Sequence, residues 1–265
     1  TLFYWFDKAG DIIGLVATHV DDDLFAGTDW WIRNVVPKIR REFHYSKWNF
    51  GEAPIMHLGR NITVHIKHQP TDYIEMDQAH YALGLRQIAL NPDRKRQTEE
   101  SLTSVEVSAL RAGTGKQAWL NRTRPDLAIR IAMQQQSMSD PKIKHILEHN
   151  AIVVAAVRDS FVKVKFVPTD WHDDRFRVYC VGDSAFMDVG PDKTSSQAGY
   201  IIGTGLDDTS KGIARGFNMQ LFRTHKIQRK MRSTLGCGTV AMSEAANAGE
   251  MVRGYSRVLS TYSIR

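Results

Sequence analysis

Three consecutive aspartates, Asp21-Asp22-Asp23, lie between apolar, β-rich segments. Residues 2–7 (LFYWFD) and 12–20 (IIGLVATHV) are both apolar, and the four residues between them predict a hairpin turn. A short strand at 24–27 follows the aspartates. The carboxylates are therefore predicted to lie at a tight turn between two strands.

The order of the remaining patterns indicates the α+β class, in two or three units. Polar segments at 91–104 and 168–174 are predicted linkers. Before the first linker we expect helices near 30–43, bent by Pro37, and 78–90, with strands at 55–66 and 73–76. Between the linkers we expect helices at 105–120, 125–138 and 141–159, followed by a strand at 161–167. After them we expect strands at 175–182, 197–204 and 217–225 and a terminal helix at 238–259.

Composition excludes several classes of protein. The chain has 265 residues, of which 42% are apolar, as in ordinary globular proteins. The two cysteines, Cys180 and Cys237, exclude a disulfide-stapled scaffold and a CxxC zinc site. No apolar run is long enough to predict a membrane span. Because the first residues already have the pattern of a strand, we expect part of a longer polypeptide that is intracellular, cytoplasmic or nuclear, and not secreted.

Positive charge is concentrated near the C-terminus. The net charge is +6, and residues 211–265 hold ten Lys or Arg against two acids. Five of these bases are close together and are the predicted nucleic-acid-binding residues: Arg223, Lys226, Arg229, Lys230 and Arg232. Binding to RNA, DNA or an RNA–DNA hybrid would release condensed counterions from the phosphates. The alternative is a solvated basic surface that binds nothing.

The acidic turn has two interpretations. Adjacent carboxylates repel one another, and a divalent cation between them removes that penalty. Polymerases use two such cations to hold the attacking and leaving oxygens of phosphoryl transfer. The alternative is an exposed β-turn, because aspartate favours turns.

Several segments, in their order along the chain, resemble the reverse transcriptase and RNase H of copia-type LTR retrotransposons. His19-Val20-Asp21-Asp22 with its flanking strands is similar to the polymerase hairpin. The other matching segments are His57-Leu58-Gly59, Gln78…Tyr81, Arg111…Gly115…Trp119-Leu120, Thr123-Arg124-Pro125-Asp126, Asp183-Ser184-Ala185-Phe186, Lys193–Tyr200 and Arg232-Ser233-Thr234-Leu235.

The resemblance implies a C-terminal part of a reverse-transcriptase palm at 1–92, a helical thumb or connection at 93–168, and a truncated RNase H-like domain at 169–265. It further implies that Asp21, Asp22 and Asp183 are catalytic residues that bind Mg²⁺ or Mn²⁺. The family's third palm carboxylate is expected on a strand before Thr1, and Gly238 stands where the family has an RNase H glutamate.

Three functions remain open at this point. The chain can be an RNA-directed DNA polymerase with RNase H by descent, with catalytic sets too incomplete for activity alone. It can be a non-catalytic remnant that binds nucleic acid through its basic C-terminal region. It can also be a protein in which the acidic turn is only a turn.

Overall fold

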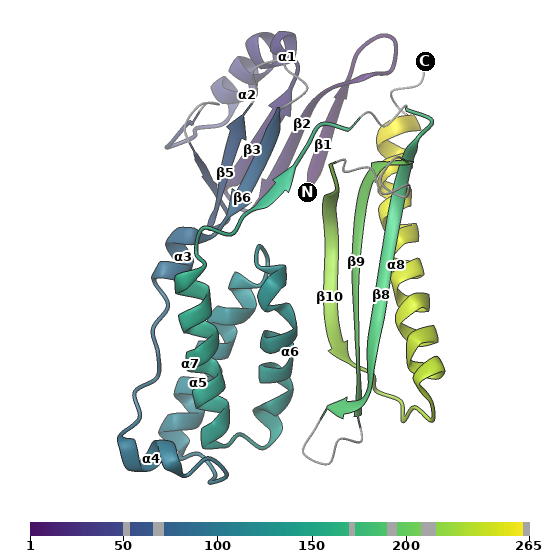
Figure 1. Cartoon of the computed structure of the whole chain (residues 1–265). Coiled ribbons are helices and arrows are strands. Elements are labelled where there is room, and N and C mark those ends of the chain that lie inside the picture. The colour runs from purple at the N-terminus through teal and green to yellow at the C-terminus, as the bar shows by residue number, and fades with distance from the viewer. Residues whose placement is uncertain (50–53, 66–71, 170–172, 190–194, 208–215, 262–265) are drawn as a thin grey trace.

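The computed structural model describes residues 1–49, 54–65, 72–169, 173–189, 195–207 and 216–261 (Figure 1). Helices contain 42% of the residues and strands 31%, so the chain combines both kinds of element, as the α+β prediction requires. Among the described helices, none combines the length and apolar character that a membrane crossing needs.

The first sheet contains the predicted N-terminal hairpin. Strands β1 (Leu2–Phe6), β2 (Ile12–His19) and β3 (Asp22–Gly27) pair antiparallel in that order. Helices α1 (Asp29–Asn34) and α2 (Val36–Glu42) follow, and the break between them lies beside Pro37, where a bend was predicted. Trp31 is fully buried against the sheet, and a Cβ at Gly14 would lie 2.1 Å from its ring. Gly14 is therefore needed for helix and sheet to approach so closely.

The second sheet has the order β4-β5-β6-β7, with all neighbouring strands antiparallel. Its strands are β4 (Ile55–His57), β5 (Arg60–His65), β6 (Tyr73–Asp77) and β7 (Val164–Phe166). The single strand predicted at 55–66 is thus a hairpin. Its two turn residues, Leu58 and Gly59, have φ of 49° and 67°, which places both in the left-handed region that hairpin turns use.

A helical unit lies between β6 and β7 in the chain (Figure 1). Its α-helices are α3 (Ala79–Leu83), α4 (Pro92–Arg96), α5 (Ser104–Leu120), α6 (Ala128–Gln136) and α7 (Ile143–Arg158). Short 3-10 turns, η1 (Pro125–Leu127) and η2 (Ser137–Ser139), lie on either side of α6. Buried Leu120, Leu127, Ile131 and Ile152 belong to the core that joins these helices.

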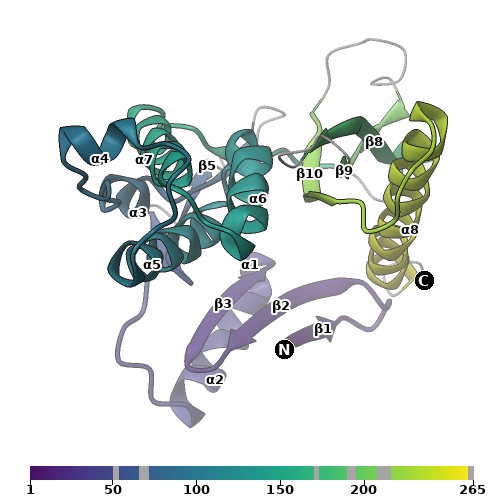
Figure 2. The same ribbon diagram turned by 90° about the horizontal axis from the view of Figure 1, so that it is seen from below.

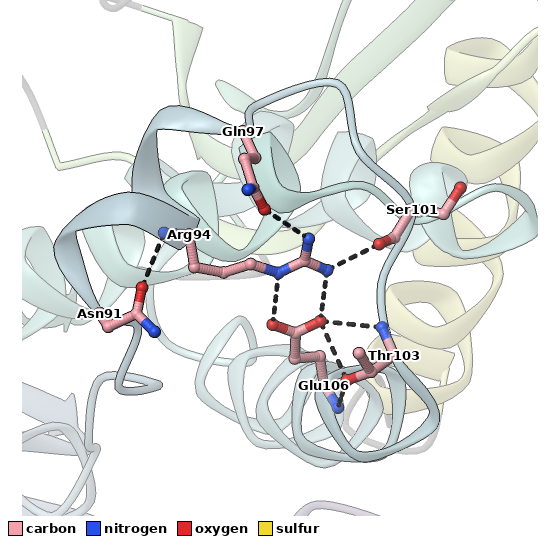
Figure 3. A network of polar contacts seen from close by, with 6 residues as sticks. All are labelled: Asn91, Arg94, Gln97, Ser101, Thr103 and Glu106. Atoms are coloured by element: carbon pink, nitrogen blue, oxygen red, sulfur yellow. Dashed lines mark hydrogen bonds and ion pairs between the residues drawn. The ribbon is translucent and has the colours of Figure 1, made fainter.

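The segment predicted as the first linker, 91–104, is ordered by a polar network (Figure 3). Asn91 caps α4, whose Arg94 donates two hydrogen bonds to Glu106, at 3.0 and 2.8 Å, and others to Gln97 and the Ser101 carbonyl. Thr103 and Glu106 form a capping box at the start of α5. The linker prediction was therefore wrong for this segment, because one charged pair and two caps satisfy its polar groups.

The C-terminal part is a three-stranded antiparallel sheet with one long helix on one face (Figure 2). Strands β8 (Phe176–Val189), β9 (Ser195–Leu206) and β10 (Asn218–Lys226) take the order β10-β9-β8, and α8 (Thr234–Thr261) follows. Ala198 packs with Cys237 and Ala241 of α8 in a small core. Helix α6 contacts β10, and Gln136 donates to Gln197, which points to the face opposite Ala198.

Candidate nucleic-acid interface and acidic turn

The acidic turn is a two-residue loop at the tip of the β2–β3 hairpin. His19 pairs with Asp22, so Val20 and Asp21 form the loop. Val20 has a φ of 55° and is 88% exposed. A positive φ is unfavourable for a β-branched residue, so the loop stores backbone strain. Asp21 and Asp22 are both exposed to solvent.

Asp23 differs from its two neighbours. It shares a face of β3 with Phe25, which packs against Trp31, Tyr45 and Trp48. The Tyr45 hydroxyl donates a 2.5 Å hydrogen bond to Asp23 Oδ2, and Asp23 Oδ1 is buried without a partner. Burial and this hydrogen bond raise the pKa of Tyr45 to about 12. Asp23 therefore ties the hairpin to the segment after α2.

The donor set fits only a loosely held cation. Mg²⁺ usually takes six oxygen ligands, and a site with two carboxylates leaves most of them to water. In the part of the chain that the structure describes, no three His, Cys, Asp or Glu side chains are grouped closely enough to hold a metal ion. Among the described residues, Asp21 and Asp22 therefore offer a cation two exposed carboxylates and no third ligand.

The tip of the β4–β5 hairpin is electrostatically coupled to the acidic turn. Burial lowers the pKa of His57, and the charge of Asp22 acts in the opposite direction. Arg60 is paired with His57 across the turn, and its buried Nε has no hydrogen-bond partner. Burial and the nearby positive charge of Arg122 lower the pKa of Arg60. Two arginines therefore lie near one another, and no carboxylate of the described residues forms an ion pair with either.

Arg122 lies at the end of a basic and aromatic stripe on α5. Arg111, Gly115 and Trp119 are spaced by four residues, so they lie on one face of the helix, and Arg122 follows just beyond its end. All four are exposed, and a Cβ at Gly115 would meet nothing within 4 Å. Trp119 Nε1 would lie 3.4 Å from a Cβ at Gly59. We call Arg111, Gly115, Trp119 and Arg122 the α5 stripe, and it leads to the β4–β5 tip.

Asp183, which the sequence resemblance predicts to be catalytic, lies exposed on β8, where its Oδ1 accepts a hydrogen bond from the Ser184 amide. Its neighbour Gly182 approaches Ala241 of α8, so Asp183 points to the opposite face of the sheet. A Cβ at Gly238 would meet nothing within 4 Å. Within the described residues, the structure brings no group of metal-ligating side chains to Asp183.

The predicted basic residues occupy β10 and the segment before α8. Arg223 and Lys226 point to opposite faces of the sheet, because they are separated by an odd number of positions. Arg229, Lys230 and Arg232 are exposed in the connection to α8. His225, between the two strand residues, contacts Glu244 of α8 at 2.9 Å. The five bases therefore do not form a single flat patch.

Comparison of the chain with protein-family models, with curated proteins and with solved structures finds no match.

The sequence resemblance includes Arg111, Gly115 and Trp119 but assigns them to no binding surface, and it includes neither Arg60 nor Arg122. The signal was available in part, since positions 111, 115, 119 and 122 follow helical spacing. Their juxtaposition with the β4–β5 tip depends on tertiary packing between segments about sixty residues apart.

Proposed function

We propose that this chain binds RNA, DNA or an RNA–DNA hybrid through the α5 stripe and the adjoining β4–β5 tip, as part of a reverse transcriptase–RNase H polypeptide of copia type. The observation that carries the proposal is the exposed α5 stripe, which leads to Arg60 at the β4–β5 tip. Among the described residues, no carboxylate forms an ion pair with Arg122 or Arg60.

The chemistry of the stripe suits a nucleic-acid backbone. Arg60 and Arg122 repel one another, and a phosphate between them would replace that repulsion with charge-assisted hydrogen bonds. Gly115 leaves room for a sugar–phosphate chain to approach the helix closely, since it carries no side chain. Trp119 offers a partly exposed ring, and aromatic side chains stack on bases without regard to sequence. We therefore propose that binding depends strongly on salt concentration and only weakly on base sequence.

For catalysis, we propose only that the chain shares ancestry with a catalytic protein. Asp21 and Asp22 correspond to a polymerase pair and Asp183 to the first RNase H carboxylate, as the resemblance implies. We expect neither primer extension nor hybrid cleavage by the chain alone, because the described residues place no group of metal-ligating side chains at Asp21 and Asp22 or at Asp183. Cleavage of an RNA–DNA hybrid that requires Mg²⁺ and is abolished by Asp183→Asn would contradict this expectation.

The test is fluorescence anisotropy with a labelled RNA–DNA hybrid at several salt concentrations. The Arg111→Ala/Arg122→Ala variant should weaken binding and flatten the slope of log affinity against log salt by about 1.8, or roughly 0.9 for each phosphate that is no longer neutralised. The matched control is Lys95→Ala/Arg96→Ala, which removes two exposed charges from α4. Equal losses in the two variants would show only an effect of net charge and would refute the proposed interface.

The basic residues in β10 and in the segment before α8 form a second arm of the same assay. If Arg223, Lys226, Arg229, Lys230 and Arg232 neutralise about four phosphates, they contribute a slope near −3.6. Replacement of Lys226, Arg229 and Lys230 by alanine removes three of these five bases and should flatten the slope by up to about 2.7. If this variant alone loses salt dependence, the interface is the C-terminal segment, and the α5 stripe does not belong to it.

A further inference from the structure

We propose that Gln78 is a positioning residue for the nucleic-acid interface, because its side-chain amide fixes the orientation of the Trp119 indole. This inference rests on the proposed function and assigns to Gln78 the role of holding the α5 stripe in register with the β4–β5 tip.

Gln78 is only 3% exposed and lies between the end of β6 and the start of α3. Its amide satisfies all its neighbours when Nε2 donates to Thr123 Oγ1 at 2.8 Å and to the Leu120 carbonyl at 3.1 Å. In that orientation Oε1 accepts a 3.1 Å hydrogen bond from Trp119 Nε1. One buried amide thus connects the second sheet with the last turn of α5 and the turn that follows it.

Tyr81 makes a second connection to the same helix. Its hydroxyl donates a 3.2 Å hydrogen bond to the Lys116 carbonyl, one turn of α5 before Leu120. The Gln78…Tyr81 pair therefore contacts α5 at two levels, and the rotation of that helix about its axis is fixed. The face that is turned outward as a result is the one that carries Arg111, Gly115 and Trp119.

The hydrogen bond to Trp119 is the specific part of this arrangement. The indole N–H is a donor with no acceptor capacity, so only an acceptor at the position of Gln78 Oε1 holds that edge of the ring. Trp119 remains 40% exposed, and its held edge lies beside Gly59 at the β4–β5 tip. Without the acceptor, the ring is free to turn away from the tip, and the stacking surface no longer has a fixed place next to Arg60 and Arg122.

The first measurement needs no variant of Gln78. The chain has six tryptophans, and Trp119→Phe identifies the Trp119 indole N–H signal in a ¹H–¹⁵N spectrum of the full chain. We expect this proton to exchange with solvent at least tenfold more slowly than the indole N–H of Trp30, which is 60% exposed. Exchange of the two protons at the same rate would overturn the proposal.

The second measurement is a double-mutant cycle read by hybrid binding. Gln78→Met fills the same volume without the amide and should weaken binding about fivefold, the effect expected from losing the one hydrogen bond that holds the Trp119 ring. In the Trp119→Phe background the same change should alter binding less than twofold, because no N–H remains to be held. Equal losses in both backgrounds would mean that Gln78 acts only on the fold, which refutes the positioning role.

These outcomes separate the inference from the proposed function. If the unmodified chain fails to bind the hybrid at any salt concentration, the proposed function fails, and slow exchange of the Trp119 proton still reports the hydrogen bond. If the chain binds but Trp119→Phe and Gln78→Met show no coupling, the proposed function stands and the role of Gln78 is wrong.

Discussion

The buried guanidinium of Arg124 offers the sharpest test of how the helical unit is held together. Arg124 is 2% exposed, and it donates to Asp126 through Nε at 2.9 Å and through Nη2 at 2.7 Å. Its Nη1 donates to the Ala156 carbonyl of α7 at 3.2 Å. Asp126→Asn removes the charge that compensates this buried cation while it preserves the shape of the side chain.

The expected cost follows from burial. Breaking a fully buried ion pair costs about 3–5 kcal/mol. The Asp126 side chain is 40% exposed, and asparagine keeps one acceptor oxygen, so we expect the free energy of unfolding to fall by about 2 kcal/mol. For a chain of this size, that change lowers the melting temperature by about 4–8 °C.

Thermal unfolding followed by circular dichroism at 222 nm measures this change. Glu148→Gln is the matched control, because Glu148 accepts a 2.8 Å hydrogen bond from Arg130 in the same helical unit, and Arg130 is 36% exposed. We expect a clearly smaller shift for the control. Equal shifts in both variants would show that burial of Arg124 does not set the strength of the pair.

Three further predictions concern the turn, the ordered linker and a buried histidine. Val20→Gly should raise the free energy of unfolding in urea by about 0.5 kcal/mol, because relief of the strain at a β-branched residue with positive φ outweighs the greater backbone entropy of glycine in the unfolded chain. A loss of stability would contradict the strained loop. The Arg94 guanidinium lowers the pKa of Glu106 to about 2, so the contribution of this ion pair to folding stability should be lost as pH falls from about 4.5 toward 2. In Glu106→Gln the urea midpoint should depend less steeply on pH in this range, and an unchanged dependence would contradict the ion pair. Burial lowers the pKa of His149, so the unfolded chain binds a proton more readily than the folded chain. Folding stability should therefore fall as pH drops below about 6.5, with the unfolding equilibrium constant rising by up to tenfold per pH unit. His149→Phe should reduce that dependence in urea titrations at pH 7 and pH 5, and identical profiles would refute the assignment.

Local sequence patterns were sufficient to predict many of the helices and strands. The hairpin over residues 2–20 follows from two apolar runs and a turn sequence, and the break at Pro37 follows from the chemistry of proline. The helices predicted at 105–120 and 141–159 agree closely with α5 and α7. These elements are long and have clear start signals, which is why the sequence predicts them.

The predicted secondary structure was wrong where tertiary contacts outweigh the local sequence pattern. Leu58 occupies a left-handed turn position with no asparagine or aspartate to mark it, so the β4–β5 hairpin was predicted as one strand. The predicted linker at 91–104 is ordered because Arg94 meets Glu106, a residue twelve positions away that no local pattern indicates. The helix predicted at 78–90 ends at Leu83, and Asn150 of α7 instead pairs with the backbone of Ile88.

The candidate site was predictable to the same extent. The adjacency of Asp21 and Asp22 at a turn is a local property and was predicted. The separate role of Asp23 depends on Tyr45, which lies twenty-two residues away, and no pattern indicates it. The α5 stripe has helical spacing that the sequence shows, but its meaning comes from Gly59 and Arg60 at its end.

Photo-crosslinking can show whether nucleic acid lies along the α5 stripe. An RNA–DNA hybrid that carries 5-iodouracil at successive positions is irradiated with the full chain, and the modified peptide is identified by mass spectrometry. We predict an adduct at Trp119 that disappears in Trp119→Phe and decreases in Arg111→Ala/Arg122→Ala. Adducts confined to the aromatic residues of β10, with none at Trp119, would show that nucleic acid does not lie along the α5 stripe.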